Sequence, residues 1–419
     1  MNKNLAFCLI SLAVSVAFSA QAGTLLPPGA ADQSPSRLQA APAPVGEFER
    51  QPVAFAWALD PEAVLDAQAP FLAESREFWA VAQASELQAG LAIDTTAAGA
   101  VIRISPAQGS RAVDPDQVRM FKNGRLIPEP QSFQRKTNAA QLKAAGMDVP
   151  DGSAIVQLAK EQGQGRFQVQ MTDAKGRYLV HVYEPESPFV FRAQADRSRV
   201  LAGDTLEVAA AMQRGDDTLA LANNQVAGVL VSPSGRSYDL AFSSGRARLQ
   251  LPDDAGSEPG LWEVQLSAGT FADGASVQRD ANTAVEVTRP TAKLDGGYGF
   301  NAAAVRFDLP VQVAAPGRYE LRGTLYATAP DGVSRPVSQA HMANWLEPGQ
   351  RQLALAFGRV NVPMGYGAPY ELRFLELKDQ SRMGTLDTRE LALREGQAPR
   401  RAIAPAPAMP VRGVAPRQR

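Results

Sequence analysis

The sequence predicts a mainly β protein: three β-sandwich, immunoglobulin-like modules in tandem, the first enlarged by short helices. Many short segments of apolar or alternating residues are separated by turn signals such as Asn123-Gly124, Pro316-Gly317 and Asp331-Gly332. The chain of 419 residues is also too long for one typical domain. Short strands at this spacing are typical of sandwiches rather than of alternating β-α units.

A weak internal repeat supports this fold class. The pattern is glycine, any residue, an aromatic, any residue, an aliphatic. The glycine makes a turn, and the aromatic and the aliphatic residue lie on the same face of a strand, where they would enter a core. The copies centre on Phe167, Tyr178, Trp262 and Tyr319.

The N-terminus carries the features of an export signal. Lys3 precedes an apolar run over residues 5–18, and a small-x-small pattern ends at Ala22. We therefore expect a signal peptide over residues 1–22, cut after Ala22, and a periplasmic or secreted protein. Cys8 would leave with the signal, so that stability would depend on packed cores rather than on disulfides.

Both ends of the mature chain are rich in proline and alanine. Residues 23–44 lack hydrophobic periodicity, so we expect a flexible leader. Residues 397–419 are expected to form a disordered basic tail with five arginines and no acid. Two interpretations of the tail stand: a tether to anionic envelope polymers or lipids, or an unselected solubilising end.

Proline-rich linkers divide the rest of the chain. We expect an N-terminal β-rich domain with helical insertions over residues 45–187 and immunoglobulin-like sandwiches over 188–290 and 291–396. In the first module, Ser75 can cap a helix that runs through Leu87 and stops at Gly90. A second, short helix is expected from Asn138 to Ala145.

Four segments of the chain resemble a known family. They are ESREFW (74–79), ELQAGL (86–91), TTAAGAVIRIS (95–105) and YLVHVYEPES (178–187). They are similar to exported Gram-negative proteins catalogued as domain of unknown function 4785. The resemblance covers about residues 45–395 and is most specific in the first module. It implies an exported, multi-domain β protein with immunoglobulin-like C-terminal modules, no assigned activity and no catalytic residues to carry over.

Composition and motifs exclude several kinds of chemistry. The formal net charge of −1 argues against nucleic acid as a partner. His181 and His341 are the only histidines, too few for a common histidine metal site, and we expect both to be structural. The motifs of a nucleophile elbow, a phosphate loop and a zinc protease are absent, and acidic turns such as Asp216-Asp217 lack the spacing of a calcium loop. We expect no cofactor, no metal and no transmembrane helix in the mature chain.

Two glycine-rich segments carry the candidate ligand surface: Tyr298, Phe300, Tyr366 and Tyr370. These aromatic rings could stack on sugar rings or on a peptide, which requires all four to be exposed and coplanar. Alternatively, each ring plugs the edge of a core at a bulge, the interpretation that we favour. We expect the tryptophans Trp57, Trp79, Trp262 and Trp345 to lie in cores.

We favour an exported, non-enzymatic protein that acts as a binding or structural module on an envelope or extracellular partner, a protein or a polymer. The alternatives are a hydrolase and a carbohydrate-binding protein that act on such a polymer. A hydrolase would need a cleft that holds two titratable groups within hydrogen-bond reach of each other and of solvent. The carbohydrate-binding alternative needs exposed aromatic rings on one face.

Overall fold

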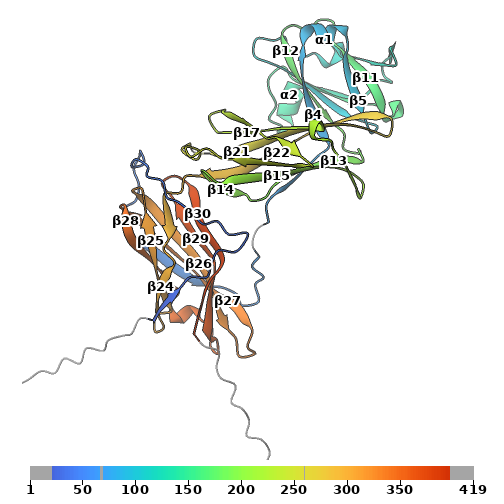
Figure 1. Cartoon of the computed structure of the whole chain (residues 1–419). Helices are drawn as coiled ribbons and strands as arrows, with labels where there is room; N and C mark the ends of the chain where they lie inside the picture. Colours follow the sequence, from blue (N-terminus) through green and yellow to red (C-terminus); the bar gives the residue numbers. More distant parts are fainter. Residues whose placement is uncertain (1–20, 67–68, 259, 397–419) are drawn as a thin grey trace, which may run out of the picture.

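The structure is a computed structural model that describes residues 21–66, 69–258 and 260–396. These residues form six sheets, and pairs of sheets enclose the three large hydrophobic cores. The three bodies lie in a row, with the first domain uppermost and the third lowest in Figure 1. The mainly β class is therefore confirmed. Residues 1–20 of the expected signal peptide 1–22 and the basic tail 397–419 lie outside the described residues, and Gln21 and Ala22 belong to a strand.

The first domain pairs a five-stranded sheet with a four-stranded one, and its core includes Ile102, Val180 and Phe167. In spatial order the larger sheet contains β4 (Glu77–Gln83), β12 (Arg177–Tyr183), β6 (Val101–Pro106), β10 (Ala154–Leu158) and β9 (Phe133–Asn138). The smaller contains β5 (Leu91–Thr95), β11 (Gly165–Gln170), β7 (Arg119–Lys122) and β8 (Arg125–Leu126). Helices α1 (Ala84–Ala89) and α2 (Ala139–Ala144) and the 3₁₀ turns Pro115–Gln117 and Lys160–Gln162 complete it.

The second domain encloses a core around Phe191, Leu230 and Trp262. One sheet contains β19 (Phe242–Ser243), β20 (Arg246–Gln250), β15 (Thr205–Arg214), β13 (Phe189–Ala195) and β3 (Leu72–Ser75), with β16 (Asp217–Leu219) beside β15. The other contains β14 (Arg199–Leu201), β22 (Ala275–Thr288), β21 (Trp262–Ala272), β17 (Val226–Val231) and β18 (Ser237–Asp239), and a 3₁₀ turn spans Asn223–Gln225.

The third domain encloses a core around Phe307, Tyr319 and Leu372. One sheet contains β1 (Gln21–Thr24), β24 (Gly297–Asn301), β25 (Arg306–Val313) and β23 (Ala292–Leu294), with β28 (Gly349–Ala356) beside β25. The other contains β2 (Val53–Ala58), β27 (Ser334–Leu346), β26 (Gly317–Thr328), β29 (Gly367–Asp379) and β30 (Gly384–Glu395), and a 3₁₀ turn spans Arg359–Asn361.

The aromatic residues of the internal repeat lie in these cores, as predicted. Phe167, Tyr178, Trp262 and Tyr319 are all almost fully buried. The hydroxyl of Tyr319 donates to the carbonyl of Ala315 at 2.7 Å, the kind of backbone contact that a tyrosine corner makes in immunoglobulin folds. The buried phenol thus keeps a hydrogen-bond partner, which a buried hydroxyl needs.

The helix expected from Ser75 to Leu87 is wrong, because most of that segment is strand β4, followed by the single-turn helix α1. The β-favouring residues Phe78, Trp79 and Val81 pair along β12, so long-range pairing overrides the local capping signal. The second expected helix is confirmed as α2, where the side-chain oxygen of Asn138 caps the first turn.

The expectation of a flexible leader over 23–44 is also wrong. Strand β1 pairs with β24, Leu25 is buried, and the side-chain amide of Gln33 donates to the carbonyl of Thr385 at 2.6 Å. The backbone of an extended, proline-rich segment still needs hydrogen-bond partners, and here the third domain supplies several of them. The lack of hydrophobic periodicity in residues 23–44 therefore did not indicate that the segment is flexible.

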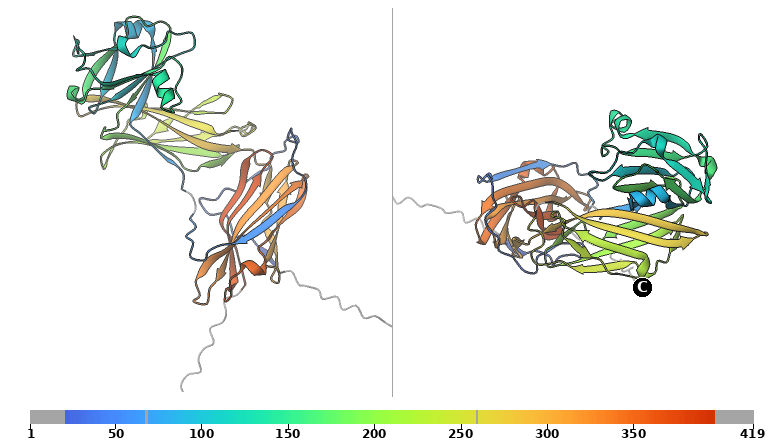
Figure 2. Two further views of the ribbon diagram at one scale, coloured as in Figure 1. Left: turned by 180° about the vertical axis from the view of Figure 1, so that it is seen from behind. Right: turned by 90° about the horizontal axis from the view of Figure 1, so that it is seen from above.

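The N-terminal segment contributes strands first to the third domain, then to the second and last to the first. Strand β2 pairs with β27 of the third domain and β3 with β13 of the second, and the chain enters the first domain only at β4. Figure 2 shows the blue strand within the orange domain and the thin connection that rises from it. The packed body of the first domain therefore begins near residue 77, and the earlier part of the expected module 45–187 contributes β2 to the third domain and β3 to the second.

Candidate functional site

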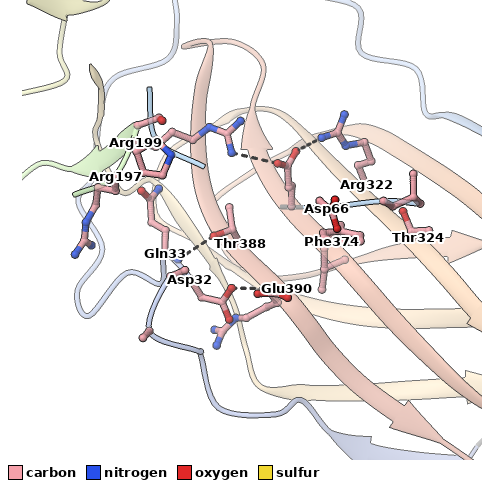
Figure 3. Close-up of a pocket in the computed structure, with 18 of the residues that line it drawn as sticks. Asp32, Gln33, Asp66, Arg197, Arg199, Arg322, Thr324, Phe374, Thr388 and Glu390 are labelled. Carbon is pink, nitrogen blue, oxygen red and sulfur yellow. Dashed lines mark hydrogen bonds and ion pairs between the residues drawn. The ribbon is translucent and has the colours of Figure 1, made fainter. Parts of the chain in front are cut away.

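The second and third domains enclose a cleft with a volume of about 800 Å³ (Figure 3). The turn over residues 196–199 forms its side in the second domain, and residues 30–33 and 64–66 of the N-terminal segment border it. The remaining side is the outer face of the sheet that contains β26, β29 and β30. Parts of the chain that are far apart in sequence therefore build this site.

A row of side chains crosses the five strands of that sheet. In register order it contains Phe55, His341, Arg322, Glu376 and Thr388. Directly opposed residues of antiparallel strands project from the same face, about 5 Å apart. The row therefore forms a continuous polar and aromatic surface, and its Arg322, Glu376 and Thr388 line the cleft.

Glu376 lies at the centre of a charge cluster that joins the two domains. Its carboxylate accepts two hydrogen bonds, from Nη1 of Arg199 at 3.2 Å and from Nη2 of Arg322 at 2.6 Å. The two arginines lie on opposite sides of the cleft (Figure 3). Burial raises the pKa of Glu376, but the charges of Lys378, Arg322 and Arg199 outweigh it and hold that pKa below its usual value. Glu376 is thus a fixed anion that ties the domains together and is poorly suited to donate a proton.

Phe374 lines the cleft from a strained position in β29. Its φ of 48° lies in the left-handed region, where a bulky side chain is a genuine outlier. The register of β29 shifts here against β26, between Arg322 and Thr324, and the nearest shift against β30 lies between Leu372 and Arg373. Such a bulge turns a side chain away from its regular direction, and the conformation costs of order 1–3 kcal/mol. The placement of this aromatic ring in the cleft therefore lowers the stability of the folded state.

An exposed aromatic cluster continues the same sheet face beyond the cleft. The side chains of Phe55 and Trp57 are 53% and 39% exposed, and their rings lie 5.0 and 5.2 Å from the ring of His341. Glu320 holds that histidine, with Oε1 2.7 Å from Nδ1. Trp57 is opposite Gln339, which lines the cleft. The aromatic cluster thus adjoins the cleft directly.

The residues that line the cleft also carry unused hydrogen-bonding capacity. Within the described ranges, Oε1 of Gln33, Nε of Arg322 and Nη1 of Arg389 are buried and have no hydrogen-bond partner. Most buried polar atoms in proteins are paired, so three such atoms around one cleft stand out. They comprise one acceptor and two donors.

The four aromatic residues of the candidate ligand surface are not exposed on one face, so they do not form the platform that was one of the two interpretations. Tyr298, Phe300 and Tyr370 are buried, and Tyr366 packs partly against the same core. The hydroxyl of Tyr298 donates to Oε2 of Glu395 at 2.7 Å, and burial together with that carboxylate raises the pKa of Tyr298. The alternative interpretation, aromatic rings that plug the edge of a core, accounts for these residues.

The two histidines lie in separate places. Nε2 of His181 is 2.8 Å from Oε2 of Glu77, and its ring stacks on Trp79 in the first domain, while His341 belongs to the aromatic cluster of the third. Within residues 21–66, 69–258 and 260–396, no three His, Cys, Asp or Glu side chains group closely enough to hold a metal ion. Nor does that part of the chain contain a helix of the length and apolarity needed to cross a membrane.

Sequence reasoning missed the main site residues. Trp57 was expected in a core but lies on an exposed edge strand, whereas Trp262 is fully buried as expected. The alternation in Val53–Ala58 places Phe55 and Trp57 on one face, a signal that could have indicated the aromatic cluster. No local pattern marks the bulge at Phe374.

Two family models match the chain. The N-terminal domain of the family described as domain of unknown function DUF4785 matches residues 44–184, and the C-terminal domain of the same family matches residues 291–394. Together these matches cover more than half of the sequence. The chain belongs to the DUF4785 family. The resemblance noted from the sequence is thereby confirmed.

A solved structure shares the fold. The crystal structure of a DUF4785 family protein from Legionella pneumophila is similar with a TM-score of 0.69 and 20% identity, over 89% of this chain and 99% of that one. A tetra-tandem repeat of a large adhesion protein gives a TM-score of only 0.19 at 15% identity, over 82% of each chain. Three domains of chicken CNTN1 give 0.17 at 10% identity, over 70% of this chain and 98% of that one. No curated protein matches the chain.

Proposed function

We propose that this DUF4785 protein is an exported binding protein that holds a glycan of the cell envelope or its surroundings in the cleft between the second and third domains. The strained placement of Phe374 is the observation that carries the proposal. Strained residues of this kind cluster at active sites and ligand clamps, although Val305 and Met383, which do not line the cleft, also have a positive φ. An aromatic ring held in a polar cleft is a natural stacking surface for a sugar.

The composition of the cleft supports a glycan in particular. Sugars present apolar CH faces, which pack on aromatic rings, and hydroxyl groups, which both donate and accept hydrogen bonds. The cleft offers Phe374 for the first kind of contact and Gln33, Gln339 and Thr388 for the second. Its extension over the exposed rings of Phe55 and Trp57 suits an extended chain of sugars rather than a single small molecule.

Binding is better supported than hydrolysis. Five of the described acidic residues line the cleft: Asp32, Asp66, Asp196, Glu376 and Glu390. Three cations hold Glu376 ionised, and both oxygens of Asp32 accept backbone N–H groups, those of Gly29 and Glu390. A glycosidase needs one carboxyl group that is protonated near neutral pH, with a raised pKa. Glu376 therefore does not fit that role.

The test uses the protein from residue 23 to 419 and affinity electrophoresis in gels that contain dextran, soluble chitosan, alginate or solubilised peptidoglycan. The wild type should be retarded by at least one polymer. Phe374→Gly should weaken that interaction about tenfold or more, without a fall in thermal stability, because glycine adopts the left-handed conformation freely. Phe271→Ala, which removes an exposed ring on β21, is the matched control. Wild-type mobility unchanged by every polymer, or retardation unchanged in Phe374→Gly, would overturn the proposal.

A further inference from the structure

A second concave surface lies where the first and second domains meet. It is separate from the cleft between the second and third domains. It is a groove with a volume of about 530 Å³. The outer face of strands β17, β21 and β22 forms one wall, and side chains of β4 and β12 form the other. None of its lining residues belongs to the cleft between the second and third domains.

The wall from the first domain is aromatic and apolar. Trp79 and Leu179 line the groove, and Leu179 is opposite Val81 in the register of β4 and β12. Both Leu179 and Val81 are exposed. The ring of Trp79 stacks on His181, with 4.7 Å between their centroids, so the indole is held in place. This wall offers a fixed apolar face to solvent.

The wall from the second domain is polar and carries amides and a hydroxyl. Gln265 is opposite Asn282, and Ser267 is opposite Asp280, in the pairing of β21 with β22. Alternation along both strands directs these residues outward, because their neighbours Leu266 and Ala281 are buried in the core. Directly opposed side chains about 5 Å apart form a compact array of donors and acceptors.

Asp280 excludes one kind of occupant. Strand β4 lies at the edge of its sheet, where an extended peptide could add as a further strand. However, Oδ2 of Asp280 accepts the backbone N–H of Trp79 at 2.6 Å. The edge is therefore capped at the centre of the groove, and strand addition would have to break this bond.

The charge of the groove disfavours an anion. No lysine or arginine is among the described residues that line it, and Asp280 is its only acid. Burial raises the pKa of the Asp280 carboxyl, with the hydrogen bond from Trp79 in opposition. A phosphate or a carboxylate in the groove would be repelled by the carboxylate of Asp280. A neutral ligand would not.

The geometry points to a second binding site, for a neutral glycan, in the groove between the first and second domains. One sugar ring would pack its CH face on Trp79 and Leu179 and direct its hydroxyls to Gln265, Ser267 and Asn282. The residues involved are separate from Phe374 and the cleft, so this inference does not rest on the function proposed above. With both sites occupied, one chain would hold a polymer at two points, which raises the effective affinity without a new contact.

The test is isothermal titration of the protein, residues 23–419, with three neutral oligosaccharides: cellohexaose, chitohexaose and laminarihexaose. At least one should bind, and Trp79→Ala should weaken it about tenfold or more. Since Trp79 also contributes to the domain junction, Gln265→Ala and Asn282→Ala provide a second measurement on exposed side chains that should leave folding unchanged. Gln278→Ala, on the same face of β22 but outside the groove, is the matched control.

The outcomes separate the two sites. Weaker binding in Trp79→Ala, Gln265→Ala and Asn282→Ala, with normal binding in Gln278→Ala and Phe374→Gly, supports the groove. Binding that Phe374→Gly abolishes and the three groove variants leave unchanged overturns the groove and supports only the cleft. The absence of heat from all three neutral oligosaccharides also overturns the groove.

Discussion

Arg279 of β22 and Glu184, the residue after β12, form a fully buried ion pair between the second and first domains, with 2.7 Å from Nη2 to Oε2. The surroundings satisfy both groups. Glu184 also accepts from the hydroxyl of Thr96 at 3.1 Å, and Nη2 of Arg279 donates to the hydroxyl of Ser187 at 2.7 Å. Because a buried charge needs such compensation, this pair fixes how the two domains meet.

Glu184→Ala should destabilise the junction strongly. It leaves the Arg279 guanidinium buried without a counter-charge, and the loss of one partner from a buried pair costs about 3–5 kcal/mol. Urea unfolding followed by near-UV circular dichroism measures the change. Replacement of both residues by methionine should recover part of the loss, since no uncompensated charge remains. Lys160→Ala, which breaks the exposed pair with Glu186, should change little. Equal effects of the two single variants would contradict this account.

Trp262→Ala should destabilise the second domain by about 3–5 kcal/mol, because it removes a fully buried ring from the middle of the core. Its chain neighbour Leu261 is exposed, so Leu261→Ala should stay within about 0.5 kcal/mol of the wild type. Denaturant titration of both variants in the full chain provides the comparison. A tolerated Trp262→Ala would mean that the glycine-aromatic repeat does not mark core corners.

Leu25→Ala should lower the melting temperature of the third domain by several degrees, whereas Leu26→Ala should not. Leu25 is buried in the core of that domain, and its backbone N–H donates to the carbonyl of Gly296 at 2.6 Å; the side chain of Leu26 is exposed. Calorimetry on the protein from residue 23 to 419 separates the two. If both variants melt like the wild type, the leader contributes nothing to the third domain.

The contact between the second and third domains should weaken in acid. Neighbouring cations hold the pKa of Glu376 below the ordinary value of 4.5, so its contribution to stability is present above about pH 4.5. That contribution is lost as the pH falls through the lower folded value. Small-angle scattering should therefore show a more open arrangement below this window. Glu376→Gln should show the open arrangement at neutral pH as well, and a compact form of this variant would argue against the cluster.

The sequence was sufficient for features that depend on local spacing. The repeat around Phe167, Trp262 and Tyr319 indicated buried corners, and the cap at Asn138 indicated a short helix; the structure has both. The family resemblance followed from short segments in the same way. The prediction of a helix after Ser75 was wrong because β12 pairs with the whole of β4. The local capping pattern contains no information about a partner strand about 100 residues away.

By itself, the sequence determined the mainly β class, the core corners and the absence of common catalytic motifs, because strand alternation and turn residues act over a few positions. The tertiary structure alone decided where the N-terminal segment lies and which side chains meet. Arg199, Arg322 and Glu376 come from two domains, and Trp79 meets Asp280 across 201 positions of chain. Contacts of this kind arise from the packing of whole domains, and the bulge at Phe374 depends on the pairing of β29 with β26, whose register shifts there.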